Sequence, residues 1–157
     1  MNNLTASLGR ALRVARRAAG FAAREPRSAL LLLRMAWWVA ALSLLMKLLP
    51  LPGALKLMTP RARPAPAGGR EKIQAELARL LDLLLAADLW VFTPTCWKRA
   101  PVLHRFLALR GIQTRVVFGV RKEDGRTLDG HAWLEAEGKP LLETTAPNYA
   151  VTFSHPS

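Results

Sequence analysis

The chain has 157 residues, enough for one domain and an extension, and its 51% hydrophobic content excludes a wholly disordered protein. Its net charge of +12 is unevenly spread: residues 1–70 contain 12 Lys/Arg and one acid, whereas residues 71–157 contain 11 Lys/Arg and 10 acids. The basic N-terminal segment would attract phosphates, anionic lipid or an acidic partner equally well, so charge alone identifies none of them.

Cysteine content and targeting signals limit the compartment and the kind of site. Cys96 is the single cysteine, which excludes an internal disulfide and a cysteine-cluster metal site and fits a reducing compartment. The start of the chain is rich in arginine but lacks the apolar core and cleavage site of a secretory signal, and a mitochondrial transit peptide is the minor alternative. We therefore expect a cytoplasmic protein.

Residues 1–58 indicate a basic, apolar helical region. The first 24 residues predict a basic amphipathic helix, because apolar residues recur at helical spacing among arginines, at Leu4, Leu8, Leu12 and Ala15. A second helix is expected over residues 28–49, ended by Pro50 and Pro52. Its expected apolar side consists of Leu31, Met35, Trp38, Leu42 and Leu45.

The uncharged part of the second helix, residues 35–46, has only 12 residues, whereas a spanning helix needs roughly 20. We therefore expect it to lie in a membrane interface or to pack within the fold. A short helical piece is expected at residues 54–58. Residues 59–70 are rich in proline, alanine and glycine and have little to bury, so we interpret them as a linker.

Residues 71–157 predict helices followed by an antiparallel sheet, which is an α+β domain with an N-terminal helical extension. The expected helices cover residues 71–88 and residues 96–110, the second ending at Gly111. Pro101 should kink the second helix or delay its start. The expected strands are residues 113–120, 131–137 and 141–145, with a polar loop over residues 121–130.

Cys96 is the candidate nucleophile because it opens a predicted helix. Thr95 can cap that helix, and a thiol at this position meets unpaired N–H groups and the positive end of the helix dipole, which favour the reactive thiolate. Lys98 and Arg99 add positive charge nearby.

His131 is the candidate general base. It is expected to start a strand directly after a polar loop, so it should lie at the rim of the sheet, where it can face a helix N-terminus. His104, in the middle of the second helix, and His155, in the C-terminal tail, fit this role less well, and we interpret both as structural or solvent-exposed.

A catalytic imidazole needs a third group to fix its orientation, and the candidates are Asp129, Glu135 and Glu143. We prefer Glu143, because it is otherwise an isolated acid in the apolar run PLLETT, with Asp129 as the alternative. Glu143 shares the strand face of His131 only if the hairpin loop between them has an odd number of residues.

Three segments, TCWKRAPVLHRFLALRGI, RVVFGV and GHAWLEAEGKPLLE, closely resemble the transglutaminase-like core of lasso-peptide biosynthesis B proteins, in the stand-alone leader-peptidase form. The likeness covers residues 70–145, and RMAWW…LLPLPG resembles the helical lead-in of that family more loosely. It implies a papain/transglutaminase-like fold with Cys96 as nucleophile and His131 as base. The third position, usually Asp in the family, falls on Glu143.

The resemblance also implies a substrate and partners. The protein would be a cysteine peptidase that removes the leader from a ribosomally made precursor peptide, acting with a leader-recognition protein and with an ATP-using macrolactam synthetase. It implies no metal and no bound cofactor for this subunit. Alternatives left open are acyl transfer to an amine and a non-catalytic membrane- or partner-binding module.

The N-terminal residues 1–58 have two interpretations of equal weight. They contact the leader-binding partner or a membrane surface, or they cover an apolar surface of the catalytic domain. Nucleic-acid binding is not expected, because no recognition motif accompanies the arginines and the first 20 residues contain no aromatic side chain.

Overall fold

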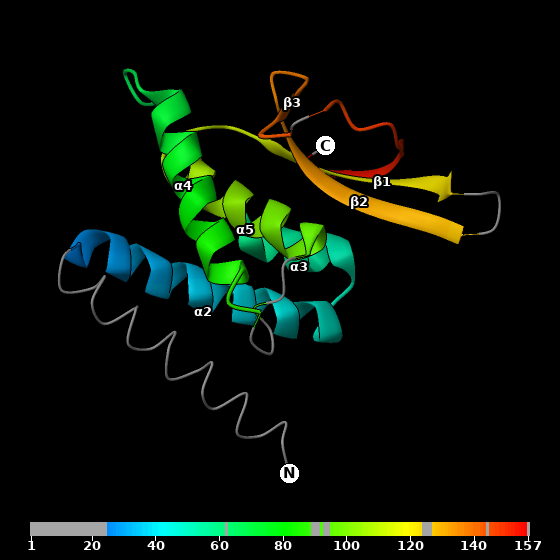
Figure 1. Ribbon diagram of the computed structural model, residues 1–157, viewed down its shortest axis with the longest axis horizontal. Helices are drawn as coiled ribbons and strands as arrows, with labels where there is room; N and C mark the ends of the chain where they lie inside the picture. Colours follow the sequence, from blue (N-terminus) through cyan, green and yellow to red (C-terminus); the bar gives the residue numbers. More distant parts are fainter. Residues whose placement is uncertain are drawn as a thin grey trace, which may run out of the picture.

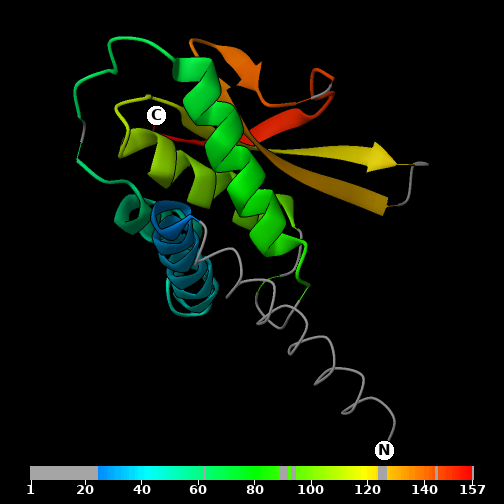
Figure 2. The same cartoon turned by 60° about the vertical axis from the view of Figure 1, so that its left-hand side comes forward.

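The computed structural model describes residues 25–156, except residues 62, 89–91, 93–94, 124–126 and 144. The helix expected over residues 1–24 lies outside the described residues. Within the described residues four helices precede four strands. Figures 1 and 2 show the helices gathered to one side of the sheet, and the hairpin of β1 (Arg115–Glu123) and β2 (Thr127–Ala136) extends beyond them. This arrangement confirms the α+β class.

Helix α2 (Pro26–Leu48) starts at a proline, which the first turn of a helix tolerates because its missing N–H has no intrahelical partner there. Met35 and Leu42 of the predicted apolar side are fully buried, and Val39 joins them. By length and composition alone the 23-residue helix could also cross a membrane, a test that buried core helices and signal sequences pass as well.

Helix α3 (Leu51–Met58) begins three residues earlier than the sequence indicated. Pro50 occupies the N-cap position and Pro52 lies in the first turn, where prolines are compatible with a helix, so these residues start α3 as well as end α2. Ala54, Leu55 and Met58 are buried.

Helix α5 (Cys96–Ala108) is the central helix. It packs against α2, α3, α4 (Arg70–Leu85) and the first two strands, and nine of its 13 residues are buried. The helix begins at Cys96, so Pro101 lies inside it without delaying its start. Buried residues of α2 and α3 share one apolar cluster with those of α4, α5 and the sheet, including Met35, Met58, Leu81, Leu103 and Val116.

Residues 59–69 form neither helix nor strand where they are described. In this segment Arg63 donates a hydrogen bond of 3.5 Å to the carbonyl oxygen of Leu109, the C-cap residue of α5. Gly111 has a φ of 75°, and a Cβ atom added there would overlap the carbonyl oxygen of Pro64. Residues with side chains rarely adopt such a φ. Both the backbone conformation and the close approach of Pro64 therefore require glycine at this position.

The antiparallel sheet has the strand order β3-β2-β1-β4, with β1 (Arg115–Glu123), β2 (Thr127–Ala136), β3 (Lys139–Leu141) and β4 (Ala150–His155). The polar loop predicted over residues 121–130 was wrong: both sides of it pair, and Arg121 lies opposite Asp129 with an ion pair of 3.0 Å. These residues extend beyond the core, so they lack the apolar alternation that marks a strand.

Candidate active site

Cys96 is the first residue of α5, as the sequence predicted. Thr95 occupies the N-cap position in an extended conformation, and its carbonyl accepts hydrogen bonds from the backbone N–H groups of Lys98 (3.1 Å) and Arg99 (3.0 Å). The predicted side-chain cap is wrong, because the buried Thr95 hydroxyl has no hydrogen-bond partner among the described residues. The half-buried thiol still lies at the positive end of the helix.

The two basic residues near Cys96 lie in different surroundings. Arg99 pairs with Asp82 of α4 through two contacts, of 2.6 and 3.0 Å, and this hydrogen-bonded carboxylate raises the pKa of Arg99 and balances its charge. Lys98 is buried, which lowers its pKa. The N-terminal end of the α5 dipole, where Cys96 lies, is a local feature that favours a thiolate.

A cavity of about 340 Å³ opens beside the thiol. Its lining comes from the C-terminal end of α4 and the first turn of α5, and consists of Asp82, Leu85, Ala86, Thr95, Cys96 and Arg99. A peptide carbonyl can therefore approach the sulfur from this side.

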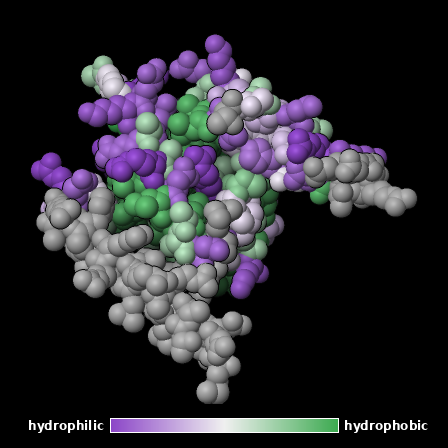
Figure 3. All heavy atoms as spheres, in the orientation of Figure 1, coloured by the Kyte–Doolittle hydropathy of each residue, from purple (hydrophilic) through white to green (hydrophobic). Residues whose placement is uncertain are grey.

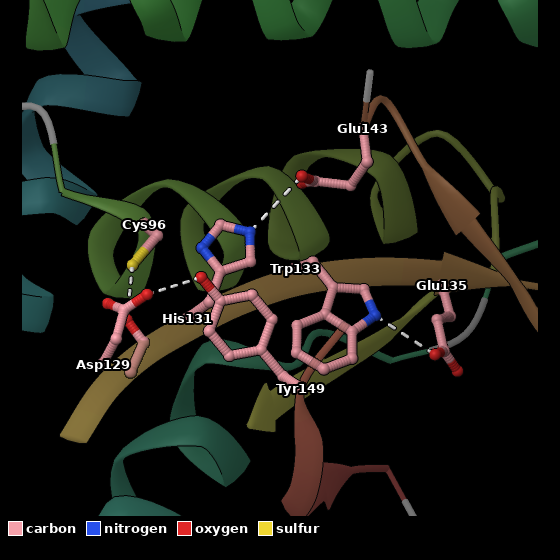
Figure 4. A network of polar contacts seen from close by, with 8 residues as sticks. Cys96, Asp129, His131, Trp133, Glu135, Glu143 and Tyr149 are labelled. Atoms are coloured by element: carbon pink, nitrogen blue, oxygen red, sulfur yellow. Dashed lines mark hydrogen bonds and ion pairs between the residues drawn. The ribbon is translucent and has the colours of Figure 1, made fainter. Parts of the chain in front are cut away.

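His131 lies in the middle of β2 rather than at its start, because the strand extends back to Thr127. Its Nε2 atom is 3.3 Å from Oε2 of Glu143, and Figure 4 shows the imidazole between that carboxylate and the Cys96 thiol. The Cys96 sulfur lies 4.0 Å from the carbonyl oxygen of Gly130, the residue before His131. The structure thus brings all three predicted residues to one place.

Glu143 reaches His131 by a route that the sequence did not indicate. The condition of a hairpin loop with an odd number of residues is not met, because Ala136 pairs with Lys139 and leaves the two-residue turn of Glu137 and Gly138. Continued pairing would put Glu143 opposite Ala132, on the other face from His131. Leu142 has a φ of 59°, and this left-handed residue ends the alternation and returns Glu143 to the His131 side.

The other candidate acids have different partners. Asp129 accepts a hydrogen bond of 2.7 Å from the Tyr149 hydroxyl and pairs with Arg121, and these contacts lower its pKa. Glu135 accepts a hydrogen bond of 3.1 Å from Trp133 and pairs with Arg115 at 2.7 Å. Among the three acids, the described hydrogen bonds and ion pairs connect only Glu143 to His131.

Two aromatic rings hold the imidazole. The Trp133 ring lies 5.9 Å from that of His131 at an interplanar angle of 16°, and the Tyr149 ring lies 5.3 Å from it at 33°. A Cβ atom at Gly119 would lie 2.8 Å from Cβ of Tyr149 and 3.0 Å from the Trp133 ring, so glycine provides their space. The sequence did not indicate a role for Tyr149, because this residue precedes β4, a strand with no clear apolar alternation.

The two other histidines are structural, and both contact Thr59. The Thr59 hydroxyl lies 3.3 Å from Nε2 of His104 and 3.0 Å from Nε2 of His155. The other ring nitrogen of His104, Nδ1, lies 2.9 Å from the Thr114 hydroxyl. Burial, together with the nearby charge of His155, lowers the pKa of His104 to about 4. His104 is therefore a neutral member of the core.

Comparison with known proteins identifies the family. No curated protein and no solved structure matches the chain. A family model described as the transglutaminase-like superfamily matches residues 45–154, which is more than two thirds of the chain and includes Cys96, His131 and Glu143. The chain therefore belongs to the transglutaminase-like superfamily.

Proposed function

We propose that the protein is a cysteine peptidase in which Cys96 is the nucleophile, His131 the general base and Glu143 the acid that orients the imidazole. The observation that carries this proposal is the 3.3 Å contact of His131 with Glu143, on a ring that faces the thiol at the start of α5. The superfamily usually contains cysteine proteases and transglutaminases, which supports this class of chemistry.

The reaction begins with the proton on Nε2 of His131, where Glu143 can accept it in a hydrogen bond, so Nδ1 is free to take the thiol proton. The Cys96 thiolate attacks the peptide carbonyl carbon and forms a C–S bond. Backbone N–H groups at the start of α5 stabilise the oxyanion, a contribution of about 3 kcal/mol per donor.

Collapse of this intermediate breaks the C–N bond, and the protonated His131 gives its proton to the departing amine. His131 then removes a proton from water, the resulting hydroxide attacks the thioester carbonyl, and the acid product leaves as the thiol is restored. Both half-reactions use the same three side chains.

The substrate is proposed from the likeness to lasso-peptide biosynthesis B proteins. The bond cut is the leader–core junction of a ribosomally made precursor peptide, which a leader-recognition protein presents and whose core a macrolactam synthetase closes into a ring. The cavity of about 340 Å³ that Cys96 lines supports this proposal, because it gives a substrate carbonyl a route to the sulfur.

Incubation of the full chain with a candidate precursor, with and without the recognition protein, tests this proposal by mass spectrometry. We expect release of the intact leader, and loss of that product with Cys96→Ala. The matched control is His155→Gln, a change outside the site, which should leave the cut unchanged. Processing by Cys96→Ala would refute the scheme.

Acyl transfer is the second candidate, because the superfamily match supports transglutaminase chemistry equally and the same thioester can react with an amine. Product masses with and without an added primary amine separate the two reactions. An alkylation rate of Cys96 equal to that of an ordinary thiol at neutral pH would instead support a non-catalytic binding module.

A further inference from the structure

Helix α2 has two apolar faces, and the described residues cover only one of them. Met35, Val39 and Leu42 are fully buried and pack with residues of α4 and α5. On the opposite side five large apolar side chains are exposed, which we call the outer stripe: Leu30, Leu33, Trp37, Leu44 and Leu48.

The outer stripe is continuous along the helix. At about 100° per residue its five positions fall within a sector of roughly 60°, over the whole length of α2. Leu57 of α3 is also exposed. In Figure 3 hydrophobic residues gather where Figure 1 draws α2 and α4, whereas hydrophilic residues cover much of the sheet and its hairpin. Monomeric soluble proteins rarely expose an apolar row of this extent.

Basic residues border the outer stripe. By helical position Arg27 and Arg34 flank it on one side and Lys47 on the other, and all three are exposed. Lys56 is exposed on α3, and Glu25 is the single acid in residues 25–58. The surface therefore combines exposed leucines, a central tryptophan and flanking cations, the combination found on helices that lie in the interface of an anionic membrane.

A shallow, mostly apolar cavity of about 590 Å³ adjoins the stripe. Its lining is Leu33, Arg34, Ala36, Trp37, Trp38, Ala40 and Phe92. The lining is of the chemical kind that an acyl chain contacts, and Arg34 carries a guanidinium of the kind that pairs with the phosphate of a lipid head group.

We propose that α2 docks along the surface of an anionic lipid bilayer, with the outer stripe inserted and the flanking cations at the phosphates. The helix lies in the plane of the membrane rather than across it, because its opposite face is held in the protein core. This docking is independent of the chemistry at Cys96, and it would hold the peptidase at the membrane.

Flotation of the full chain with vesicles of phosphatidylcholine, alone or mixed with phosphatidylglycerol, tests the proposal. We expect binding to the mixed vesicles that weakens as salt is raised. Leu33→Gln with Trp37→Gln, at side chains 68% and 70% exposed, should lower the partition coefficient about tenfold or more. Leu128→Gln, at a leucine 72% exposed on β2, is the matched control and should not lower it.

Two double variants test the contribution of the flanking cations to vesicle binding. Arg27→Gln with Arg34→Gln should also weaken binding about tenfold, whereas Lys122→Gln with Lys139→Gln, which removes equal charge from the sheet, should not. Circular dichroism checks that each variant is folded, and Cys96→Ala should bind like the unmodified protein.

Three results would overturn the proposal. Vesicle binding that survives Leu33→Gln with Trp37→Gln would assign docking to another part of the chain. Absence of vesicle binding, with a dimer that this double variant dissociates, would assign the stripe to a second copy. Equal binding to neutral vesicles would exclude the role of charge.

Discussion

The Nε2 atom of His131 and the Oε2 atom of Glu143 lie 3.3 Å apart, although the pairing of β2 with β3 directs residue 143 toward the opposite face of the sheet. The contact exists because Leu142 adopts a left-handed conformation between the last paired residue and Glu143. The orientation of the proposed base therefore depends on a backbone feature one residue away from the acid.

Glu143→Gln should lower kcat/KM by about 10²- to 10⁴-fold, because an amide cannot stabilise the imidazolium as a carboxylate does. Glu143→Asp keeps the charge on a shorter side chain, so its kcat/KM should lie between those of the unmodified protein and Glu143→Gln. The pH dependence of Cys96 alkylation gives a second measurement that needs no precursor. Full activity of Glu143→Gln, with loss in Asp129→Asn, would make Asp129 the orienting acid.

Leu142→Gly should retain activity, since glycine adopts a positive φ readily and the leucine side chain is already 38% exposed. Leu142→Val should lose activity, because a β-branched residue disfavours that conformation and would turn Glu143 away from His131. The measurement is turnover of each variant beside its thermal unfolding. Equal activity of both variants would show that Leu142 does not set the position of the acid.

Gly119→Ala should reduce activity with the fold retained, because the added methyl displaces the two rings that hold His131. We expect the free energy of unfolding to fall by about 1–3 kcal/mol, as in other overpacked sites. Gly68→Ala is the control, since its added Cβ would meet nothing within 4 Å. Tyr149→Phe keeps the ring and removes the hydroxyl that donates to Asp129, so its effect on turnover should be smaller than that of Tyr149→Ala. Unchanged turnover in Tyr149→Ala would remove the positioning role.

Acidification should destabilise the fold between pH 6.5 and about 4, through His104. Its pKa falls from 6.5 in the unfolded chain to about 4 in the folded protein, so in this range the unfolded state binds more protons and stability rises with pH. The contribution of His104 to the free energy of unfolding is fully present above pH 6.5, and it decreases by about 3 kcal/mol as the pH falls to 4. Urea unfolding at several pH values measures it.

His104→Gln should flatten that pH dependence, because the titrating group is gone. His155→Gln should flatten it less, since it removes a neighbouring ring whose charge contributes to the low pKa of His104. The same slope in His104→Gln as in the unmodified protein would assign the titration to another group.

Gly111→Ala should lower the free energy of unfolding by more than about 2 kcal/mol, because it combines an unfavourable φ with an overlap at Pro64. Gly138→Ala is a matched control: its φ of 76° is nearly the same, but nothing lies within 4 Å of the added Cβ. Equal losses in the two variants would show that residues 59–70 move away from α5 freely, as a flexible linker would.

Local patterns in the sequence determined the α+β class, the helical start at Cys96 and the choice of His131 over His104 and His155. These features depend on short-range physics: apolar spacing, proline and glycine at helix ends, and the dipole at a helix N-terminus. Local signals failed where polar residues pair beyond the core, as in the β1–β2 hairpin, and in β4, which has no alternation to find.

Only the tertiary structure decided which acid meets His131, that Tyr149 joins it, and that the described residues leave one face of α2 uncovered. The sequence favoured Glu143, with Asp129 as the alternative, but it could not fix the choice. The position of Glu143 depends on strand register and on the left-handed conformation of Leu142, which no sequence pattern predicts. Leucines on the two faces of α2 look alike in sequence. The packing of α4 and α5 against one face makes it core and leaves the other exposed to solvent.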